Sequence, residues 1–146
     1  HDDAKHAKRP QESPPLRTIH DAFVRSRGMH GAKHCLGSRE VLRDGSLGPY
    51  RWLTYETVDI RVDELGAGLF HVSRIVAESL APGDTRVQGC DLRLFPRVGI
   101  MCENRPEWVI ADLACAKFGL ISVPLQTAGS FTLAQLMRLS EIGVMI

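Results

Sequence analysis

The clearest hydrophobic pattern runs through the middle of the chain. Six aliphatic residues recur there at intervals of four and three: Val58, Val62, Leu65, Leu69, Val72 and Val76. This spacing predicts one amphipathic helix from Tyr55 to Leu80, with Thr54 as its N-cap and Glu56 in its first turn. Gly66 and Gly68 lie inside it, and we expect both to allow close packing against another backbone. The stripe covers fewer than four heptads without flanking charge pairs, which argues against a coiled coil.

Strands and helices alternate in the last third of the chain. Asn104 is the expected N-cap of a helix with Pro106 in its first turn, and Gly119 ends that helix. Its few charges do not share a face, so it should be buried on several sides. The predicted elements are a strand at 98–102, a helix at 106–118, a strand at 120–123, a helix opening with a capping box at 132–135, and a strand after Glu141. This order predicts an α/β fold with a βαβαβ parallel sheet core and right-handed crossovers.

The first third of the chain is less regular. Residues 1–17 carry three prolines among many charges, and we expect a flexible lead-in. Thr18 is expected to cap a helix with Asp21 in its first turn, ended by Gly28 and Gly31. The face predicted for that helix holds Ile19, Ala22, Phe23 and Ser26. A short strand at Cys35–Gly37 and a turn at Asp44-Gly45 then indicate a hairpin into Arg51–Thr54.

Composition and charge narrow the function classes. The 146 residues include 18 basic and 17 acidic side chains, so the formal net charge is +1 and gives no support for nucleic-acid binding. The longest uncharged run, Phe118–Met137, contains glycines, a proline and glutamines, so we do not predict a transmembrane helix. No secretory leader pattern is present at residue 1.

Candidate metal and thiol chemistry is weak. Cys35, Cys90, Cys102 and Cys115 have no C-x-x-C spacing, which favours four free, mostly structural thiols in a reducing compartment. His30 and His34 are four residues apart with Cys35 next to them, but glycines break the helix that would align them. We therefore predict no zinc site. Trp52 and Trp108 are expected to be packing aromatics.

Two stretches resemble a known family. The first is Tyr50-Arg51-Trp52-Leu53-Thr54-Tyr55-Glu56, followed by the stripe to Leu69. The second runs from Val98-Gly99-Ile100 through Asn104-Arg105-Pro106-Glu107-Trp108 and Asp112-Leu113-Ala114-Cys115 to Ser122-Val123-Pro124-Leu125. Together they resemble AMP-forming acyl-CoA synthetases of the adenylate-forming superfamily, and most of all the long-chain fatty acid–CoA ligases.

The resemblance implies a fold, a reaction and substrates. Residues 18–146 would be the N-terminal portion of an AMP-binding (adenylation) domain, truncated at its C-terminal end. The full-length enzyme would join a fatty acid to coenzyme A with ATP and Mg²⁺, through an acyl-adenylate. The family also implies a cytoplasmic protein, and peripheral contact with the cytosolic face of a membrane stays open.

The family's reactive groups have no counterpart in this sequence. The nearest approach to its phosphate loop is Thr127-Ala128-Gly129-Ser130, which lacks a lysine and a second glycine. We interpret it as a strand-to-helix turn, with a ligand-lining turn as the alternative. We therefore assign no catalytic, cofactor-binding or metal-ligating residue, and we expect an inactive fragment. The apolar run Gly143–Ile146 favours a cut inside a larger domain over a small complete one.

Other interpretations remain. Val123-Pro124-Leu125-Gln126-Thr127 also resembles the adenylation domain of carboxylic acid reductases. A catalytically dead homologue acting as a scaffold is the non-enzyme alternative. A nicotinamide-binding domain is disfavoured because no Gly-x-Gly-x-x-Gly follows a strand. The 13 residues Thr85–Arg97 have no counterpart in the family pattern, so they are either a surface insertion or an error in the coding sequence.

Overall fold

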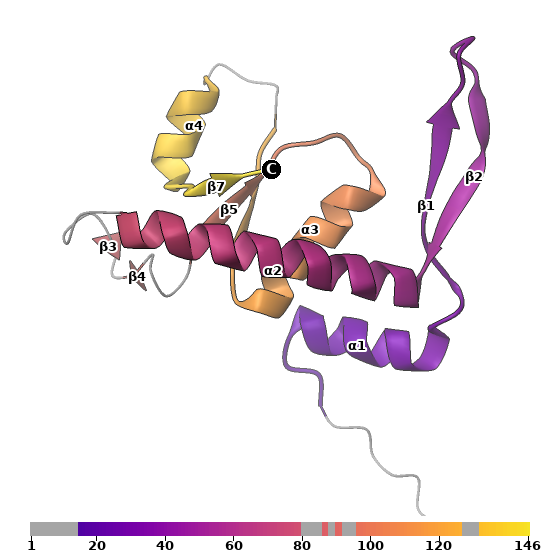
Figure 1. Ribbon diagram of the computed structural model, residues 1–146, viewed down its shortest axis with the longest axis horizontal. Coiled ribbons are helices and arrows are strands. Elements are labelled where there is room, and N and C mark those ends of the chain that lie inside the picture. Colours follow the sequence, from indigo (N-terminus) through magenta and orange to yellow (C-terminus); the bar gives the residue numbers. More distant parts are fainter. Residues whose placement is uncertain (1–14, 80–85, 88–89, 92–95, 127–131) are drawn as a thin grey trace, which may run out of the picture.

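The long helix α2 organises the molecule. A computed structural model describes residues 15–79, 86–87, 90–91, 96–126 and 132–146. The elements are α1 (Ile19–His30), β1 (His34–Val41), β2 (Leu47–Thr54), α2 (Tyr55–Ser79), β3 (Arg86–Val87), β4 (Cys90–Asp91), β5 (Arg97–Ile100), α3 (Pro106–Phe118), β6 (Ile121–Pro124), α4 (Leu133–Ser140) and β7 (Val144–Met145). A hairpin of β1 and β2 projects from the N-terminal end of α2 (Figure 1).

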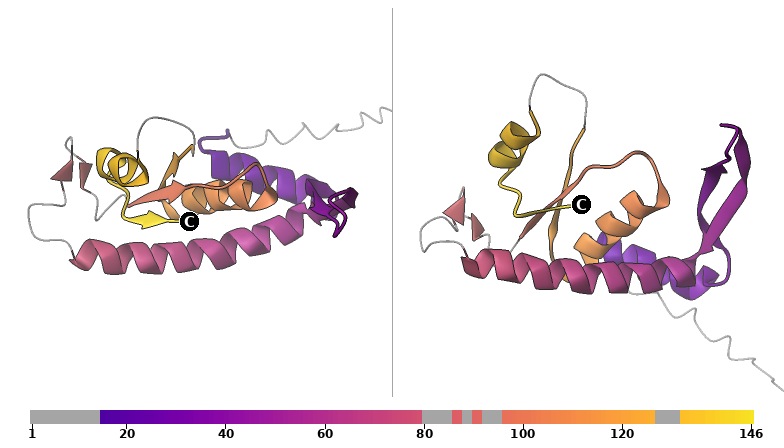
Figure 2. Two further views of the ribbon diagram at one scale, coloured as in Figure 1. Left: turned by 90° about the horizontal axis from the view of Figure 1, so that it is seen from above. Right: turned by 45° about the horizontal axis from the view of Figure 1, so that its top comes forward.

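The predicted parallel sheet is confirmed. Its strand order is β6-β5-β7, with both neighbours parallel to β5. Val98 and Ile100 of the central strand are buried, as expected for a strand covered on both faces. Figure 2 shows that the sheet, α3 and α1 all lie on one side of α2. The fold is therefore mixed α/β, with α2 as the base of a layered core.

The buried face of α2 follows a different row from the predicted one. The fully or nearly fully buried residues are Val58, Val62, Gly66, Leu69, Ser73 and Ala77, whereas Val72 is exposed. The observed row repeats every 11 residues, or about 3.67 per turn, close to the natural period of a helix. A seven-residue repeat drifts by about 20° per heptad on a straight helix, so the predicted stripe was right at its start and wrong towards its end.

Of the two glycines in α2 that were expected to allow close packing, only Gly66 does so. A Cβ on Gly66 would lie 2.3 Å from ring carbons of Phe118, so this glycine does allow close packing, although against a side chain instead of a backbone. A Cβ on Gly68 would meet no described atom within 4 Å. The expectation for Gly68 is therefore wrong.

Helix ends follow the predicted capping chemistry in most places. Thr18 accepts a hydrogen bond from the Asp21 backbone N–H at 3.0 Å, and Asp21 accepts one in return from the Thr18 N–H at 3.0 Å. Thr132 and Gln135 form the same reciprocal arrangement at α4. Gly119 ends α3 with φ of +69°, a conformation that glycine adopts without strain.

One predicted helix end is only partly right, and another is off by one residue. Helix α1 continues through Gly28 and ends at Gly31, because a single glycine lowers helix stability by only about 1 kcal/mol. The N-cap of α3 is Arg105, one residue later than Asn104, and its side chain makes no capping bond. Pro106 at the first helical position sets that boundary, since its ring fixes φ near the helical value.

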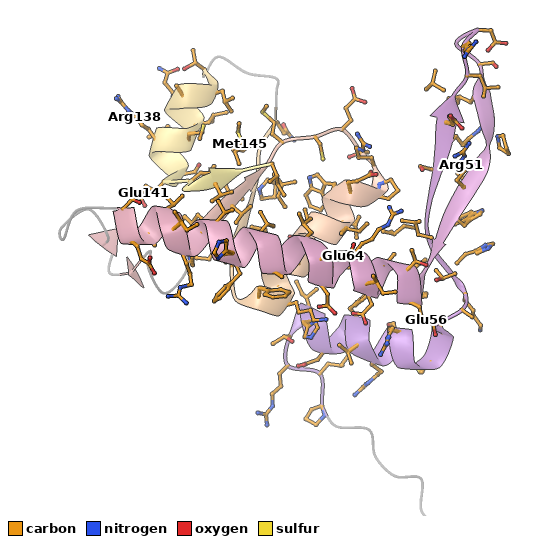
Figure 3. All side chains as sticks on the ribbon, in the orientation of Figure 1. Arg51, Glu56, Glu64, Arg138, Glu141 and Met145 are labelled. Atoms are coloured by element: carbon orange, nitrogen blue, oxygen red, sulfur yellow. The ribbon has the colours of Figure 1, made fainter. Side chains whose placement is uncertain are left out.

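The hairpin is longer than predicted. Both of its strands have eight residues, and the turn places Gly45 at φ of +82°. Asp44 accepts hydrogen bonds from the N–H and the hydroxyl of Ser46, which fixes the turn. At the base, Leu36 and Leu53 pack against the core formed by Phe23, Val58, Val62, Ile110 and Ala114. Farther out, Arg51 lies away from the helical body (Figure 3).

Ion pairs connect the three N-terminal helices. Asp59 of α2 lies 3.2 Å from Arg27 of α1 and 3.4 Å from Lys117 of α3, measured between side-chain nitrogen and oxygen atoms. Asp63 also pairs with Lys117, 2.5 Å away. This pairing raises the pKa of Lys117, mainly through its hydrogen bond with Asp63. The network links α1, α2 and α3 beside the core.

Some predictions fall partly outside the described residues. These are the flexible lead-in, of which residues 1–14 are not described, and most of Thr85–Arg97. Within the latter, β3 and β4 pair antiparallel and β5 begins at Arg97. Among the described residues, no helix is both long and apolar enough to cross a bilayer.

Candidate functional site

The carboxyl ends of the three parallel strands meet at one edge of the sheet. The Leu125 N–H donates to the Ile100 carbonyl at 2.9 Å, and the Met101 N–H donates to the Ile146 carbonyl at 2.9 Å. The crossover through α3 leads to one side of β5 and the crossover through α4 leads to the other. Open α/β sheets bind ligands at such a switch in direction, so this edge is the first place to look for a site.

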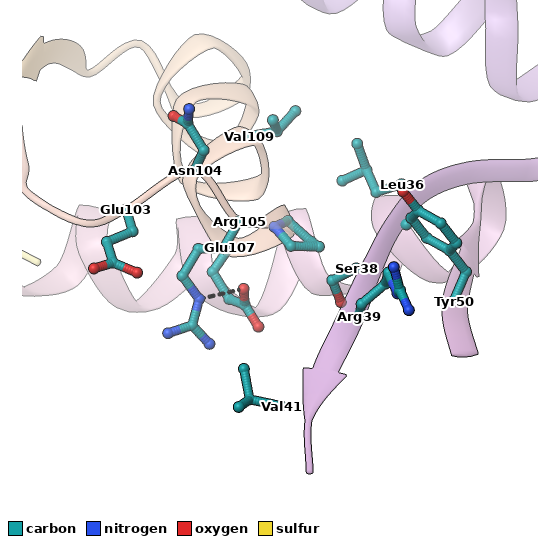
Figure 4. Close-up of a pocket in the computed structure, with 12 residues that line it drawn as sticks. Leu36, Ser38, Arg39, Val41, Tyr50, Glu103, Asn104, Arg105, Glu107 and Val109 are labelled. Carbon is teal, nitrogen blue, oxygen red and sulfur yellow. Dashed lines mark hydrogen bonds and ion pairs between the residues drawn. The ribbon is translucent and has the colours of Figure 1, made fainter. Parts of the chain in front are cut away.

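A pocket opens beside this edge, between the hairpin and the start of α3 (Figure 4). Its volume is about 750 Å³. One wall comes from β1 and Tyr50, and the other comes from Glu103 to Glu107 with Val109. These walls lie more than 50 residues apart in the sequence, so no local sequence pattern could predict the pocket. No local pattern signals that Arg39 and Arg105 face a shared cavity.

Two arginines dominate the chemistry of the pocket. Arg105 donates from Nε to Glu107 Oε2 at 2.7 Å, and this contact raises the pKa of Arg105 and lowers that of Glu107. Arg39 donates to the carbonyls of Leu47 and Gly48, both at 2.7 Å, and its guanidinium lies 5.8 Å from the centre of the Tyr50 ring. Both cations therefore already have partners within the described structure.

The pocket offers polar groups that can bind a ligand. Its described lining contains no histidine, cysteine or lysine, so it offers neither a general base that titrates near neutral pH nor a thiol nucleophile. The Arg105–Glu107 pair is solvent-exposed and contributes little to stability. Because both guanidinium groups have internal partners, a ligand would have to share or replace those contacts.

The residues considered for a zinc site lie beside aromatic rings. His34 stacks on Trp52 with ring centroids 5.1 Å apart, whereas the nearest ring to His30 is Tyr55 at 6.1 Å. No group of three histidine, cysteine or acidic residues within the described ranges could hold a metal ion. The described residues therefore do not fit a magnesium site.

The cysteines divide by burial. Cys35, Cys102 and Cys115 are free thiols, and the side chain of Cys90 lies outside the described residues. Cys115 is buried between α2 and β5, and burial raises the pKa of its thiol to about 11. Cys102 is exposed in the loop after β5, so it is not one of the packed, structural thiols that were expected to be the majority. The Thr127–Ser130 turn lies outside the described residues.

Comparison with known proteins indicates the family that the chain resembles, which the pocket alone does not. Residues 89–146 match the family described as AMP-binding enzyme. Long-chain-fatty-acid–CoA ligase 6 of Mus musculus is 31% identical over 131 residues, which is 89% of this chain. The chain is similar to AMP-binding enzymes over residues 89–146 and to a long-chain fatty acid–CoA ligase over most of its length. It spans about one sixth of the length of that relative, 16%.

Solved adenylate-forming structures share the fold. The crystal structure of CmiS6 matches 93% of this chain with a TM-score of 0.60 and 18% identity, and this match is 28% of that chain. The adenylation–carrier didomain of carboxylic acid reductase from Segniliparus rugosus, in complex with AMP, matches 91% with a TM-score of 0.58 and 17% identity, 18% of that chain. At these identities the likeness shows the fold alone.

Proposed function

We propose that the complete protein is an AMP-forming long-chain fatty acid–CoA ligase in which residues 18–146 form the N-terminal portion of the adenylation domain. The observation that carries this proposal is the 31% identity to a long-chain fatty acid ligase over 131 residues, together with the match to the AMP-binding enzymes. A cytoplasmic location, alone or with peripheral contact to a membrane, is part of the proposal. The three described free thiols are consistent with a reducing compartment.

The proposed reaction has two steps. In the first, a carboxylate oxygen of the fatty acid attacks the α-phosphorus of ATP, the bond to the β-phosphate breaks, and acyl-AMP and pyrophosphate form. In the second, the thiol sulfur of coenzyme A attacks the acyl carbon, AMP leaves with its bonding electrons, and the thiol proton is released to solvent. The products are a fatty acyl thioester and AMP.

The role we propose for these 146 residues is structural. Within the described ranges there is no candidate metal cluster, and both arginines of the pocket have internal partners. A triphosphate needs several free cationic or N–H donors that stabilise its developing charge. We therefore expect the reactive groups to come from parts of the complete protein outside this chain, and the isolated chain to be inactive.

The test is fatty-acid-dependent exchange of pyrophosphate into ATP. The complete reading frame and the 146-residue chain are expressed separately and assayed with palmitate, ATP and Mg²⁺. The complete protein should catalyse exchange and, with coenzyme A added, form palmitoyl-CoA, while the 146-residue chain shows neither. Turnover by the short chain would contradict the structural role, and a complete protein that binds but never activates fatty acids would favour the scaffold alternative.

A carboxylic acid reductase is the second candidate, favoured by the run Val123-Pro124-Leu125-Gln126-Thr127. It would share the adenylation step but reduce the activated acid instead of passing it to coenzyme A. Aldehyde formation with oxidation of NADPH in the same preparations would support the reductase. Thioester formation without NADPH oxidation would support the ligase.

A further inference from the structure

The outward side of the hairpin carries a row of exposed apolar residues. Trp52 stacks on Tyr50 with ring centroids 5.4 Å apart, and Val41 pairs with Leu47 across the strands. The exposed fractions are 66% for Val41, 52% for Leu47, 60% for Tyr50 and 48% for Trp52. We call these four residues the hairpin face. Because strand side chains alternate, the opposite side of the hairpin is the one whose Leu36 and Leu53 reach the core.

The hairpin face continues into the pocket. Val41 and Tyr50 belong to both, and Arg39 lies between them with its guanidinium near the Tyr50 ring. Across the pocket, Arg105, Glu103 and Glu107 supply charges of both signs (Figure 4). Aromatic residues and arginine at the centre with charged groups at the rim is the composition of a protein interface.

One of several exposed aliphatic residues outside the hairpin provides the contrast. Ile60 of α2 is 59% exposed, more than Leu47. Its neighbours one turn away along the same helix face are the exposed Glu56 and Glu64, so it is an isolated apolar residue on a charged surface. Single exposed apolar residues are normal on soluble proteins, whereas contiguous ones mark contact sites.

The lengths of similar proteins indicate the occupant of the hairpin face. The mouse ligase is about six times longer than this chain, and the matched unit is 28% of the CmiS6 chain. The same fold therefore occurs accompanied by much more polypeptide. We propose that the hairpin face and the pocket form an intramolecular docking surface, covered in the complete protein by polypeptide outside these 146 residues. This rests on the longer protein assumed under the proposed function.

The test is a pair of substitutions that should have equally small effects on the Tm of the 146-residue chain but different effects on the Tm of the complete protein. Leu47→Glu and Ile60→Glu both change side chains that are more than half exposed here, so each should shift the Tm of the 146-residue chain by less than about 2 °C. In the complete protein, Leu47→Glu should lower the Tm by about 5 °C or more because the charge is buried without a partner, and Ile60→Glu should leave it unchanged. Equal shifts in the complete protein would overturn the proposal.

A second measurement does not depend on how the short chain unfolds. Backbone hydrogen exchange in the peptide 41–54 of the complete protein should be at least about 100-fold slower than in the 146-residue chain. Equal exchange in both, or a reading frame that stops at Ile146, would overturn the docking surface. So would a dimer of the short chain that Leu47→Glu converts to monomer, because the occupant would then be a second copy.

Failure of this proposal can be separated from failure of the proposed function. Tm and hydrogen exchange report burial of the hairpin face whether or not the protein activates fatty acids. A complete protein that is inactive yet destabilised by Leu47→Glu alone would keep the docking surface and reject the ligase. A complete protein that activates fatty acids and whose Tm is unchanged in both variants would keep the ligase and reject the docking surface.

Discussion

The helical body and the hairpin of the same chain are stabilised in opposite ways. In the body, Val58, Val62 and Ala114 are completely inaccessible to solvent and come from two helices that pack directly on each other. In the two hairpin strands, the one buried residue is Gly48, at the far end from the body. The body therefore has a buried core of its own, whereas the side chains of the hairpin strands are mostly exposed or only partly buried.

The difference shows what each region needs from the rest of the protein. In the body, α2, α3 and the sheet cover one another and form the core, although Phe70, Val72 and Ile75 of α2 stay exposed. The hairpin gains its order from cross-strand hydrogen bonds, the turn at Asp44 and the stacked rings, all of which act at short range. Substitutions of buried residues in the body should lower the stability of the 146-residue chain. Substitutions in the hairpin face should lower stability only in the complete protein, where the docking surface is covered.

The largest expected effect compares an aliphatic truncation in each region. Ile100→Ala removes a side chain that is 1% exposed in the central strand, and should lower the free energy of unfolding by about 2–5 kcal/mol. Val41→Ala in the hairpin should change it by less than about 0.5 kcal/mol, because Val41 is mostly solvated. Urea unfolding of the 146-residue chain measures both values. A similar cost at the two positions would show that the hairpin is part of the core.

The sequence predicted the body better than the hairpin, for a physical reason. Strand and helix order after Val98 follows from local signals, such as Pro106 at a helix start and Gly119 at its end, and the structure confirms it. The burial of α2 beyond Leu69 depends on which elements lie against it, and a seven-residue stripe cannot show this. The pocket needed residues from β1 and α3 to meet, which no local pattern encodes.

A matched pair of glycine substitutions tests how tightly the body is packed. Gly66→Ala would place a methyl group 2.3 Å from the Phe118 ring, and should destabilise by about 1–2 kcal/mol after the gain in helix propensity. Gly68→Ala meets no described atom and should stabilise by about 0.5–1 kcal/mol. Thermal unfolding of both variants gives the comparison. Stabilisation by both would mean that Phe118 moves aside freely and that the body is looser than its burial suggests.

Alkaline pH should lower the free energy of unfolding because the buried thiol of Cys115 resists deprotonation in the folded state. Burial raises the pKa of its thiol from 9.0 to about 11, so between these values the unfolded chain loses the proton first. Stability is therefore complete below pH 9 and falls as pH rises, by about 1.4 kcal/mol at pH 10. The difference between the native protein and Cys115→Ala, measured at pH 8 and pH 10, isolates this group. A difference that does not change with pH would refute the assignment.

The candidate pocket could not be predicted from the sequence. The sequence analysis assigned no catalytic residue, and that remains a prediction because the Thr127–Ser130 turn lies outside the described residues. The roles of Arg39 and Arg105 could not be anticipated, since each arginine has ordinary neighbours in sequence. Their shared position depends on the hairpin folding back towards the start of α3.

A further prediction concerns a buried hydroxyl group inside the body. Ser73 of α2 is 2% exposed, and its hydroxyl has no hydrogen-bond partner among the described residues. A buried polar group without a partner costs free energy, and alanine is the better helix former. Ser73→Ala should therefore stabilise the chain by about 1 kcal/mol. Ser79→Ala on the same helix is the control, because that hydroxyl is exposed and donates to the Ile75 carbonyl at 2.8 Å. If Ser73→Ala is instead destabilising, the hydroxyl has a partner in solution, and the body is less completely closed to water than the hairpin comparison requires.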